Sequence, residues 1–140
     1  MTIDHLGIAV KSLEKSLVFY RDILGLPVEG PEEVATEGVR IAFLPLGESV
    51  IELLEPMQPD SSVARFLAKR GEGIHHVCLR VARIEESLAS LRRKGAEIIE
   101  PAPRIGAGGR RVAFIHPRST GGVLLELVES PDPPGPSTGA

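Results

Sequence analysis

The sequence predicts an α+β fold made of two tandem β-α-β-β-β modules that form one curved mixed β-sheet, a half-barrel, with the helices outside. Two observations lead to this prediction. Residues 3–10 and 74–81 are similar apolar, strand-like stretches, and their alignment places His5 on His76 at an offset of 71 residues. The same offset continues into the next segment, where it aligns Leu13, Leu17 and Tyr20 with Ile84, Leu88 and Leu91. A half of roughly 70 residues cannot bury both faces of its own sheet, so the two halves are expected to share a core.

The size of the chain fits this organisation. It has 140 residues, of which 42% are apolar, as expected for one globular domain. We expect a single domain at 1–130, divided into module one at 1–57, a connecting helix at 58–72 and module two at 73–130. Residues 131–140 are rich in Pro and Gly and are expected to form a disordered C-terminal tail.

The elements of the first module follow from hydrophobic periodicity. Apolar residues alternate in the expected strands, and they recur at helical spacing between Ser12, a suitable N-cap, and Gly25. The expected elements are a strand at 3–10, a helix at 13–24, an irregular Glu-rich stretch at 26–38, strands at 39–43 and 50–55, and a connecting helix that carries Val63, Phe66 and Leu67 and ends at Gly71.

The second module repeats this plan. Its helix has Glu85 and Glu86 in the first turn and basic residues in the last turn, which is the arrangement that the helix dipole favours. The expected elements are a strand at 74–81, a helix from Ile84 to Gly95, a short strand at 97–99, a loop at 101–109, and strands at 111–116 and 122–128.

Composition argues against several classes of protein. No apolar run approaches the ~20 residues that a membrane-spanning helix needs, and no secretory signal is visible at the start. Cys78 is the single cysteine, so an internal disulfide is excluded and a cytoplasmic location is expected. The net charge of −3 with interspersed signs and only five Phe and Tyr residues argue against nucleic-acid binding.

One basic cluster is an exception to this mixed charge. It lies in the second half, interleaved with glycines, and it is formed by Arg104, Arg110, Arg111 and Arg118. Such a cluster is either a solvated surface or an anion-binding loop whose backbone N–H groups approach a phosphate.

Four polar residues interrupt the apolar strands at equivalent positions. His5 and His76 lie on the first strand of each half, and Glu52 and Glu126 lie on the last strand once a three-residue insertion is allowed. A buried, unpaired carboxylate is costly, so each must be protonated, ion-paired or bound to a metal. A lone histidine in a strand is usually structural and a lone glutamate often lies at a sheet edge. The coincidence of all four predicts a divalent metal site with N and O ligands.

Three other residues have simpler interpretations. His75 aligns with Asp4 and alternates to the opposite face from His76, so a structural role is expected. His116, before Pro117, is either a surface residue or a substrate contact. Cys78 is expected to be a small core residue.

Several motifs resemble those of the vicinal oxygen chelate superfamily, which includes glyoxalase I and extradiol dioxygenases, and most closely its methylmalonyl-CoA epimerase family. The resemblance covers residues 2 to about 130 and rests on DHLGIAV (4–10), IELLEP (51–56), GIHHV (73–77), GAGG (106–109) and FIHPRSTGGVLLEL (114–127). It implies that the metal ligands are His5, His76 and Glu126, with Glu52 where some relatives have glutamine. It also implies a homodimer and a divalent ion (Co, Mn, Ni, Zn or Mg).

The implied reaction is the interconversion of (2R)- and (2S)-methylmalonyl-CoA through a metal-stabilised enolate. Epimerisation needs one base on each face of the planar intermediate. The resemblance implies that both are carboxylates, namely Glu126 and a glutamate of the first half. We expect the latter to be Glu37, although Glu32 and Glu33 are close in sequence and a solvated loop residue is the simpler interpretation of Glu37. The expected contacts to the acyl-CoA substrate are Arg110, Arg118 and His116.

Three alternatives share this fold. A glyoxalase I-type lactoylglutathione lyase would use similar ligands, but it does not explain the motif at 116–122. An extradiol dioxygenase would need only two histidines and one carboxylate, with open iron positions. A non-catalytic binder of small ligands would not need all four ligands.

Overall fold

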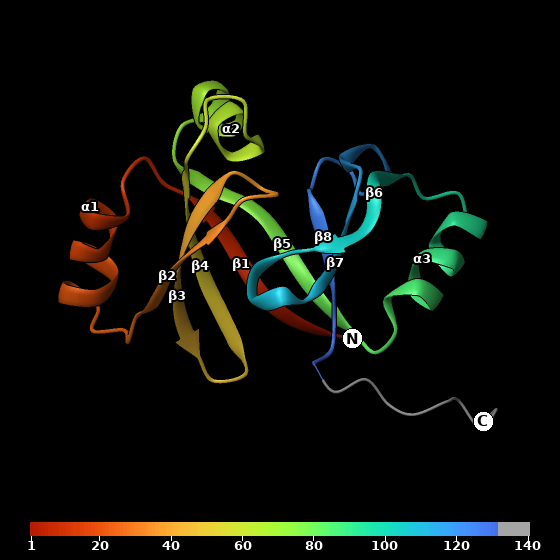
Figure 1. Cartoon of the computed structure of the whole chain (residues 1–140), viewed down its shortest axis with the longest axis horizontal. Coiled ribbons are helices and arrows are strands. Elements are labelled where there is room, and N and C mark those ends of the chain that lie inside the picture. Colours follow the sequence, from red (N-terminus) through yellow and green to blue (C-terminus); the bar gives the residue numbers. More distant parts are fainter. Residues whose placement is uncertain (132–140) are drawn as a thin grey trace. The chain divides into compact units, whose positions relative to one another are not determined.

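The strands pair in the same order in both halves of the chain. In the computed structural model, which describes residues 1–131, the hydrogen-bonded order is β1-β4-β3-β2 in the first module and β5-β8-β7-β6 in the second (Figure 1). In the first module β1 pairs in parallel with β4, and β3 pairs antiparallel with both β4 and β2. In the second, β7 pairs antiparallel with β6 and β8. The predicted α+β fold of two β-α-β-β-β modules with a mixed sheet is therefore confirmed.

The bounds of the elements are close to those expected. The first module comprises β1 (Thr2–Ala9), α1 (Leu13–Leu17), the π-helical η1 (Val18–Ile23), β2 (Glu29–Val34), β3 (Val39–Leu46) and β4 (Ser49–Pro56), followed by α2 (Ser62–Arg70). The second comprises β5 (Gly73–Val81), α3 (Ile84–Arg93), β6 (Ile98–Ile105), β7 (Arg111–Ile115) and β8 (Leu125–Glu129), with short 3₁₀ turns η2 (Ala107–Gly109) and η3 (Pro117–Ser119).

The chain divides into two compact units. The N-terminal unit is Asp4–Val77, and the C-terminal unit is Met1–Ile3 together with the chain from Cys78 onward. The border therefore falls inside β5, a few residues after the predicted start of module two at residue 73. The predicted ranges of modules and connecting helix remain a prediction, and the predicted tail lies, apart from Pro131, outside the described residues.

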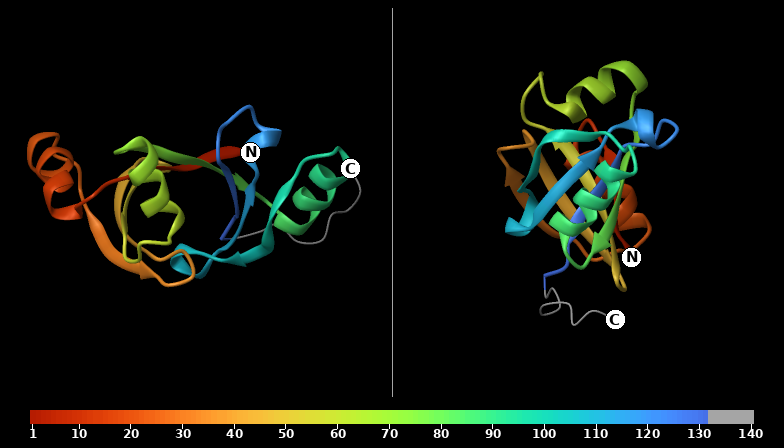
Figure 2. Two further views of the ribbon diagram at one scale, coloured as in Figure 1. Left: turned by 90° about the horizontal axis from the view of Figure 1, so that it is seen from above. Right: turned by 90° about the vertical axis from the view of Figure 1, so that its right-hand side faces the viewer.

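Each unit buries an apolar cluster between its strands and its own helix; Figure 2 shows α1 and α3 alongside the strands of their own units. In the N-terminal unit the cluster consists of Val10, Leu13 of α1, Ala42, Leu44 and Leu53. In the C-terminal unit it consists of Val81, Ile84 and Leu88 of α3, Ala113, Ile115 and Leu127. Because side chains alternate along a strand, the residues between these positions point to the other face of the sheet. That second face carries the candidate site.

Serine side chains cap the N-terminal ends of α1 and α2. The Ser12 hydroxyl accepts a hydrogen bond from the Lys15 N–H at 3.2 Å, and Ser61 accepts one from the Ala64 N–H at 3.1 Å. Ser61 is therefore the N-cap of α2. Both bonds satisfy a backbone donor that the first helical turn leaves unpaired.

Two strand predictions were wrong. The stretch expected to be irregular at 26–38 contains β2, and the loop expected at 101–109 is largely the continuation of β6. Both strands contain prolines, which argue against a strand because Pro31, Pro101 and Pro103 have no N–H to donate to a neighbouring strand. Each strand has a single hydrogen-bonded neighbour in its module and a register shift, so the missing donors are tolerated.

No helix among residues 1–131 combines the length and the apolar character needed to cross a membrane.

Candidate metal site

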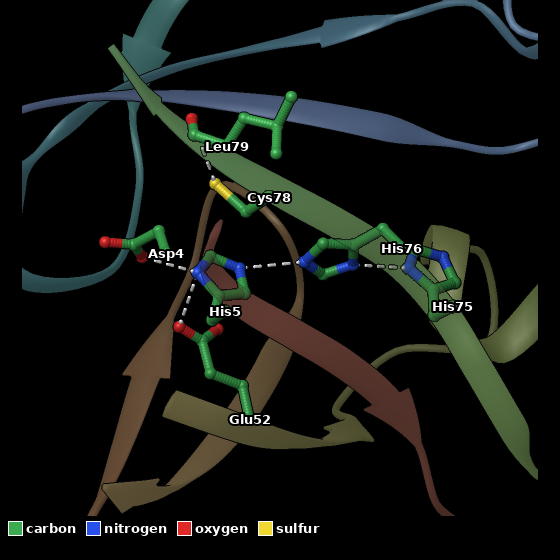
Figure 3. Close-up of polar contacts among 7 residues, drawn as sticks. All are labelled: Asp4, His5, Glu52, His75, His76, Cys78 and Leu79. Carbon is green, nitrogen blue, oxygen red and sulfur yellow. Dashed lines mark hydrogen bonds and ion pairs between the residues drawn. The ribbon is translucent and has the colours of Figure 1, made fainter. Parts of the chain in front are cut away.

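The N-terminal unit brings together three of the predicted ligands. His5, Glu52 and His76 each place one ligand atom within 4.8 Å of the others, and all three are buried. The Nε2 atoms of the two histidines are 3.0 Å apart, and Glu52 Oε2 lies 3.1 Å from His5 Nδ1 (Figure 3). Residues from three strands therefore converge on one point.

Strand register explains this convergence. Gly7 of β1 is paired with Glu52 of β4, and His5 lies two residues before Gly7, so His5 and Glu52 share the face opposite the helix. His76 reaches the same place because its ring lies over Gly7. A Cβ on Gly7 would be 2.2 Å from His76 Cε1, which leaves no room for any other residue there.

Gly7 is a site residue that sequence reasoning missed. A glycine inside an otherwise regular strand often indicates a close approach by another group. Its position two residues after His5 was a signal that could have identified it.

Asp4 orients the first histidine. Its Oδ2 is 2.7 Å from His5 Nδ1, and the Asp4 side chain is buried with it. A carboxylate at Nδ1 favours the tautomer with the proton on that nitrogen and leaves the Nε2 lone pair available as a ligand. This is the usual arrangement behind a metal-binding histidine.

His75 makes the corresponding contact to the second histidine. Its Nδ1 is 2.9 Å from His76 Nδ1, and its Nε2 is 3.1 Å from the Ser62 hydroxyl at the start of α2. The Phe66 ring packs edge-on against it at 5.2 Å between centroids. His75 therefore lies outside the group of three ligands, behind one of them. Asp4 and His75, which the duplication aligns, each contact the Nδ1 of the histidine that follows.

The three residues fit a divalent ion. Ligands about 2.0–2.1 Å from an ion, at right angles as in octahedral geometry, lie about 3.0 Å from each other. The two Nε2 atoms have that separation. Imidazole nitrogen with carboxylate oxygen suits Zn, Co, Ni and Mn, and a bound cation would compensate the cost of burying Glu52.

Glu126 occupies the equivalent position of the C-terminal unit. It lies on β8 directly opposite Phe114 of β7, as Glu52 lies on β4 opposite Phe43 of β3. Both glutamates are buried, at 5% and 7% exposure for Glu52 and Glu126. The structure repeats the environment of the two carboxylates, and the role of Glu126 as a fourth ligand remains a prediction.

The predicted base Glu37 lies in the turn between β2 and β3. Val39, two residues after Glu37, is paired with Pro56, whereas Glu52 is paired with Phe43. The four-residue step from Val39 to Phe43 spans about 13 Å. The Glu37 backbone therefore lies beyond the paired residues of β3, and its side chain is half-buried, with Oε1 buried.

The three predicted substrate contacts lie in the C-terminal unit. The Arg118 guanidinium donates to Glu97 at 2.8 Å, and the Arg118 backbone N–H donates to His116 Nδ1 at 3.0 Å. This ion pair lowers the pKa of Glu97 and raises that of Arg118. Arg110 follows η2 and is half-buried, and its neighbour Arg111 pairs with Glu85 and Glu129. Carboxylates therefore neutralise part of the basic cluster.

Comparison with known proteins identifies the class. Residues 4–114 match the model of the glyoxalase/bleomycin resistance protein/dioxygenase superfamily. The chain belongs to this superfamily, as its paired modules and the buried His-Glu-His group indicate.

Several of its relatives within the superfamily are named as methylmalonyl-CoA epimerases. The mitochondrial methylmalonyl-CoA epimerase of Bos taurus is 40% identical over 129 residues, which cover 91% of this chain and 74% of that protein. The ethylmalonyl-CoA/methylmalonyl-CoA epimerase of Cereibacter sphaeroides is 39% identical, with coverage of 89% and 95%. A structure of the Streptomyces coelicolor epimerase in complex with 2-nitronate-propionyl-CoA superposes with a TM-score of 0.90 at 39% identity, covering 97% of this chain and 99% of that one. The resemblance inferred from the motifs is confirmed.

Proposed function

We propose that this protein is an isomerase that interconverts (2R)- and (2S)-methylmalonyl-CoA by proton transfer at C2. One observation carries the proposal: a buried His5-Glu52-His76 group lies in a chain that aligns with nearly the full length of an epimerase solved with an acyl-CoA analogue. The Nε2 atoms of the two histidines face each other, and the buried Glu52 carboxylate contacts the other ring nitrogen of His5.

The residues that would hold a divalent ion are His5, Glu52, His76 and Glu126. When bound, the ion supplies Lewis-acid stabilisation of the negative charge that develops on the thioester oxygen when C2 loses its proton. Asp4 and His75 hold the two imidazoles in place, and Gly7 admits the His76 ring.

The proton transfers need bases on both faces of the substrate. The C2–H lies between a thioester and a carboxylate, which makes it acidic enough for a glutamate to remove it once the charge is stabilised. We propose Glu126 as one base. For the other we propose Glu37, the first-half glutamate to which the resemblance points.

Recognition of the CoA portion is assigned to the second module. We propose that Arg110, Arg118 and His116 contact it. Their chemistry supports this role, because guanidinium groups bind phosphate oxygens through paired hydrogen bonds.

We also propose a homodimer in the cytoplasm. Val18, Phe19, Ile23 and Leu24 of the η1 region are each half or more exposed, an apolar surface of the kind that marks interfaces. Cys78, the single cysteine, is buried and reduced. Light scattering after size exclusion tests the dimer.

Deuterium exchange tests the proposed function. Protein supplied with Co²⁺ and incubated with methylmalonyl-CoA in D₂O should incorporate deuterium at C2, and EDTA should abolish this incorporation. Exchange that persists after the metal is stripped, or no exchange with metal restored, would contradict the proposal. Inactivity on methylmalonyl-CoA together with formation of lactoylglutathione from the glutathione hemithioacetal would instead favour a glyoxalase.

A further inference from the structure

We infer that Phe43 limits the size of the alkyl group that the substrate carries at C2, so that the chain acts on malonyl thioesters with short C2 substituents; the inference rests on the proposed epimerase function. Phe43 lies on β3, directly opposite the buried Glu52 of β4. Glu52 is in turn paired with Gly7 of β1, over which the His76 ring lies. One row across the sheet therefore contains the His76 ring, the Glu52 carboxylate and the Phe43 ring.

Sheet geometry places the Phe43 side chain beside this ligand. Paired residues on neighbouring strands point to the same face, and their Cβ atoms are about 5 Å apart. Phe43 and Glu52 therefore extend side by side from the face that carries the candidate metal site. Phe43 is the single aromatic residue in β1, β2, β3 and β4, all of which lie in the described part of the chain.

Part of the Phe43 ring remains accessible. Its apolar neighbours on the same face, Ile41 and Leu54, are 4% and 3% exposed, whereas Phe43 is half-buried. Among residues 1–131, Phe43 has no aromatic ring and no cation stacked on it. An apolar group bound next to Glu52 can therefore contact this ring.

The equivalent ring of the second module is covered. Phe114 lies opposite Glu126, as Phe43 lies opposite Glu52. The Arg104 guanidinium lies over the Phe114 ring, with Cζ 5.1 Å from the ring centroid. The duplication thus places an aromatic residue beside each buried glutamate, and the ring of module one is the one without a cation on it. An alkyl group gains more from that surface, because it does not have to bury a charge.

Gly30 of β2 fixes the position of the Phe43 ring. Its φ of +95° is one that glycine adopts readily, and a Cβ built on it would lie 3.4 Å from Phe43 Cδ2. The β2 backbone is therefore close to the ring on one side. A long alkyl group at C2 would have to displace a supported ring, and such overpacking is costly.

The substrate has one apolar part near the reacting atom. C2 joins the thioester to the carboxylate, so a substrate bound through these polar groups at the ligands carries its C2 substituent beside the row of Glu52 and Phe43. An apolar pocket distinguishes substituents that differ by one methylene by about 10–200-fold. Phe43 is the residue placed to make that distinction.

The test measures kcat/KM for inversion of methyl-, ethyl- and butylmalonyl-CoA by the full-length protein loaded with Co²⁺. Wild type should prefer the methyl over the butyl substrate by at least about 100-fold. Phe43→Ala removes the ring and should raise the ratio of butyl to methyl activity by at least about 10-fold. Phe43→Trp enlarges the side chain and should lower the ratio of ethyl to methyl activity. Damage to the fold would lower all activities together and leave these ratios unchanged.

Leu46→Ala is the matched control. Leu46 lies three residues after Phe43 on the same strand, so alternation directs it to the other face. Its substrate ratios should stay within about twofold of wild type. Equal use of methyl- and butylmalonyl-CoA by wild type would overturn the inference. So would wild-type ratios in both Phe43 variants, or the same shift in Leu46→Ala as in Phe43→Ala.

A second measurement needs no turnover. The chain contains no tryptophan, so Phe43→Trp introduces a single indole. Co²⁺ quenches the fluorescence of nearby indoles, so its binding in the absence of substrate should remove most of the emission of Phe43→Trp and less of that of Leu46→Trp. Equal quenching in the two variants, with cobalt bound to both according to its absorption spectrum, would overturn the placement of residue 43 beside the ligands.

The proposed function and the role of Phe43 fail separately. A wild-type protein that inverts none of the three substrates with metal restored would overturn the epimerase function and the role of Phe43 together. An active wild type whose substrate ratios persist in both Phe43 variants would overturn the role of Phe43 alone.

Discussion

At the scale of single residues, the supports of the site repeat as regularly as the ligands do. Asp4 and His75 occupy equivalent places before His5 and His76, and each contacts the Nδ1 of its neighbour. The two contacts differ in charge, since a carboxylate makes one and an imidazole the other. The duplication therefore preserved the function of the position while its chemistry diverged.

Replacing Gly7 should disable the site without unfolding the chain. In Gly7→Ala the new Cβ meets the His76 ring at 2.2 Å, so the ring must leave its position and one ligand is lost. We expect cobalt affinity, measured by calorimetry, to fall at least 100-fold. Gly73→Ala is the matched control, because no atom lies within 4 Å of its Cβ position. Equal affinities in the two variants would contradict the close approach of His76.

Removing the supports behind the ligands should weaken metal binding moderately. Asp4→Asn and His75→Ala are each expected to lower cobalt affinity about 10- to 100-fold, the usual effect of losing a hydrogen bond to a ligating histidine. Asp60→Asn makes the same chemical change as Asp4→Asn at an exposed position and should have no effect. Unchanged affinity in both support variants would show that packing alone orients the imidazoles.

At the scale of elements, the helices and inner strands were predictable, whereas the outer strands β2 and β6 were not. Helix α3 has its buried residues at helical spacing and charges at its ends that suit its dipole, so each local signal agrees. In β2 and β6 the prolines argue against a strand, although the structure forms one in each case. These strands are set by pairing with β3 and β7, which is information from distant residues.

The core under α3 should be sensitive to lost volume. Leu88 is 1% exposed and packs on residues of β7 and β8, so Leu88→Ala is expected to lower the free energy of unfolding by about 2–5 kcal/mol. Leu46→Ala makes the same change where the side chain is 41% exposed and should cost only about 0.5 kcal/mol. Urea denaturation of the two variants gives the comparison. Similar losses would mean that Leu88 is not part of a tightly packed core.

At the scale of the whole molecule, metal binding and folding should be linked. Ligands from β1, β4 and β5 meet only in the folded chain, so an ion that binds there stabilises the native state. Free metal at about 1,000 times its Kd should add about 4 kcal/mol to the free energy of unfolding. Thermal melts with Co²⁺ and with EDTA measure this difference.

The same linkage gives a dependence on pH. An imidazole binds metal only when neutral, so the stabilisation by Co²⁺ should be largest near neutral pH and should decline as the pH falls and protons compete. Melts recorded with and without Co²⁺ across acidic to neutral pH should converge at the acidic end. A constant difference in melting temperature would show that the metal binds elsewhere.

The sequence by itself determined the duplication, the fold class and three of the residues that meet at the candidate site. These residues could be predicted because each of them interrupts an apolar strand, and because the two modules show the same interruption at equivalent positions. Only the tertiary structure decided which side chains support the ligands and why residue 7 is glycine. The reason is physical: both facts depend on how strands far apart in the chain are paired, and the sequence of a single strand does not specify its register with another.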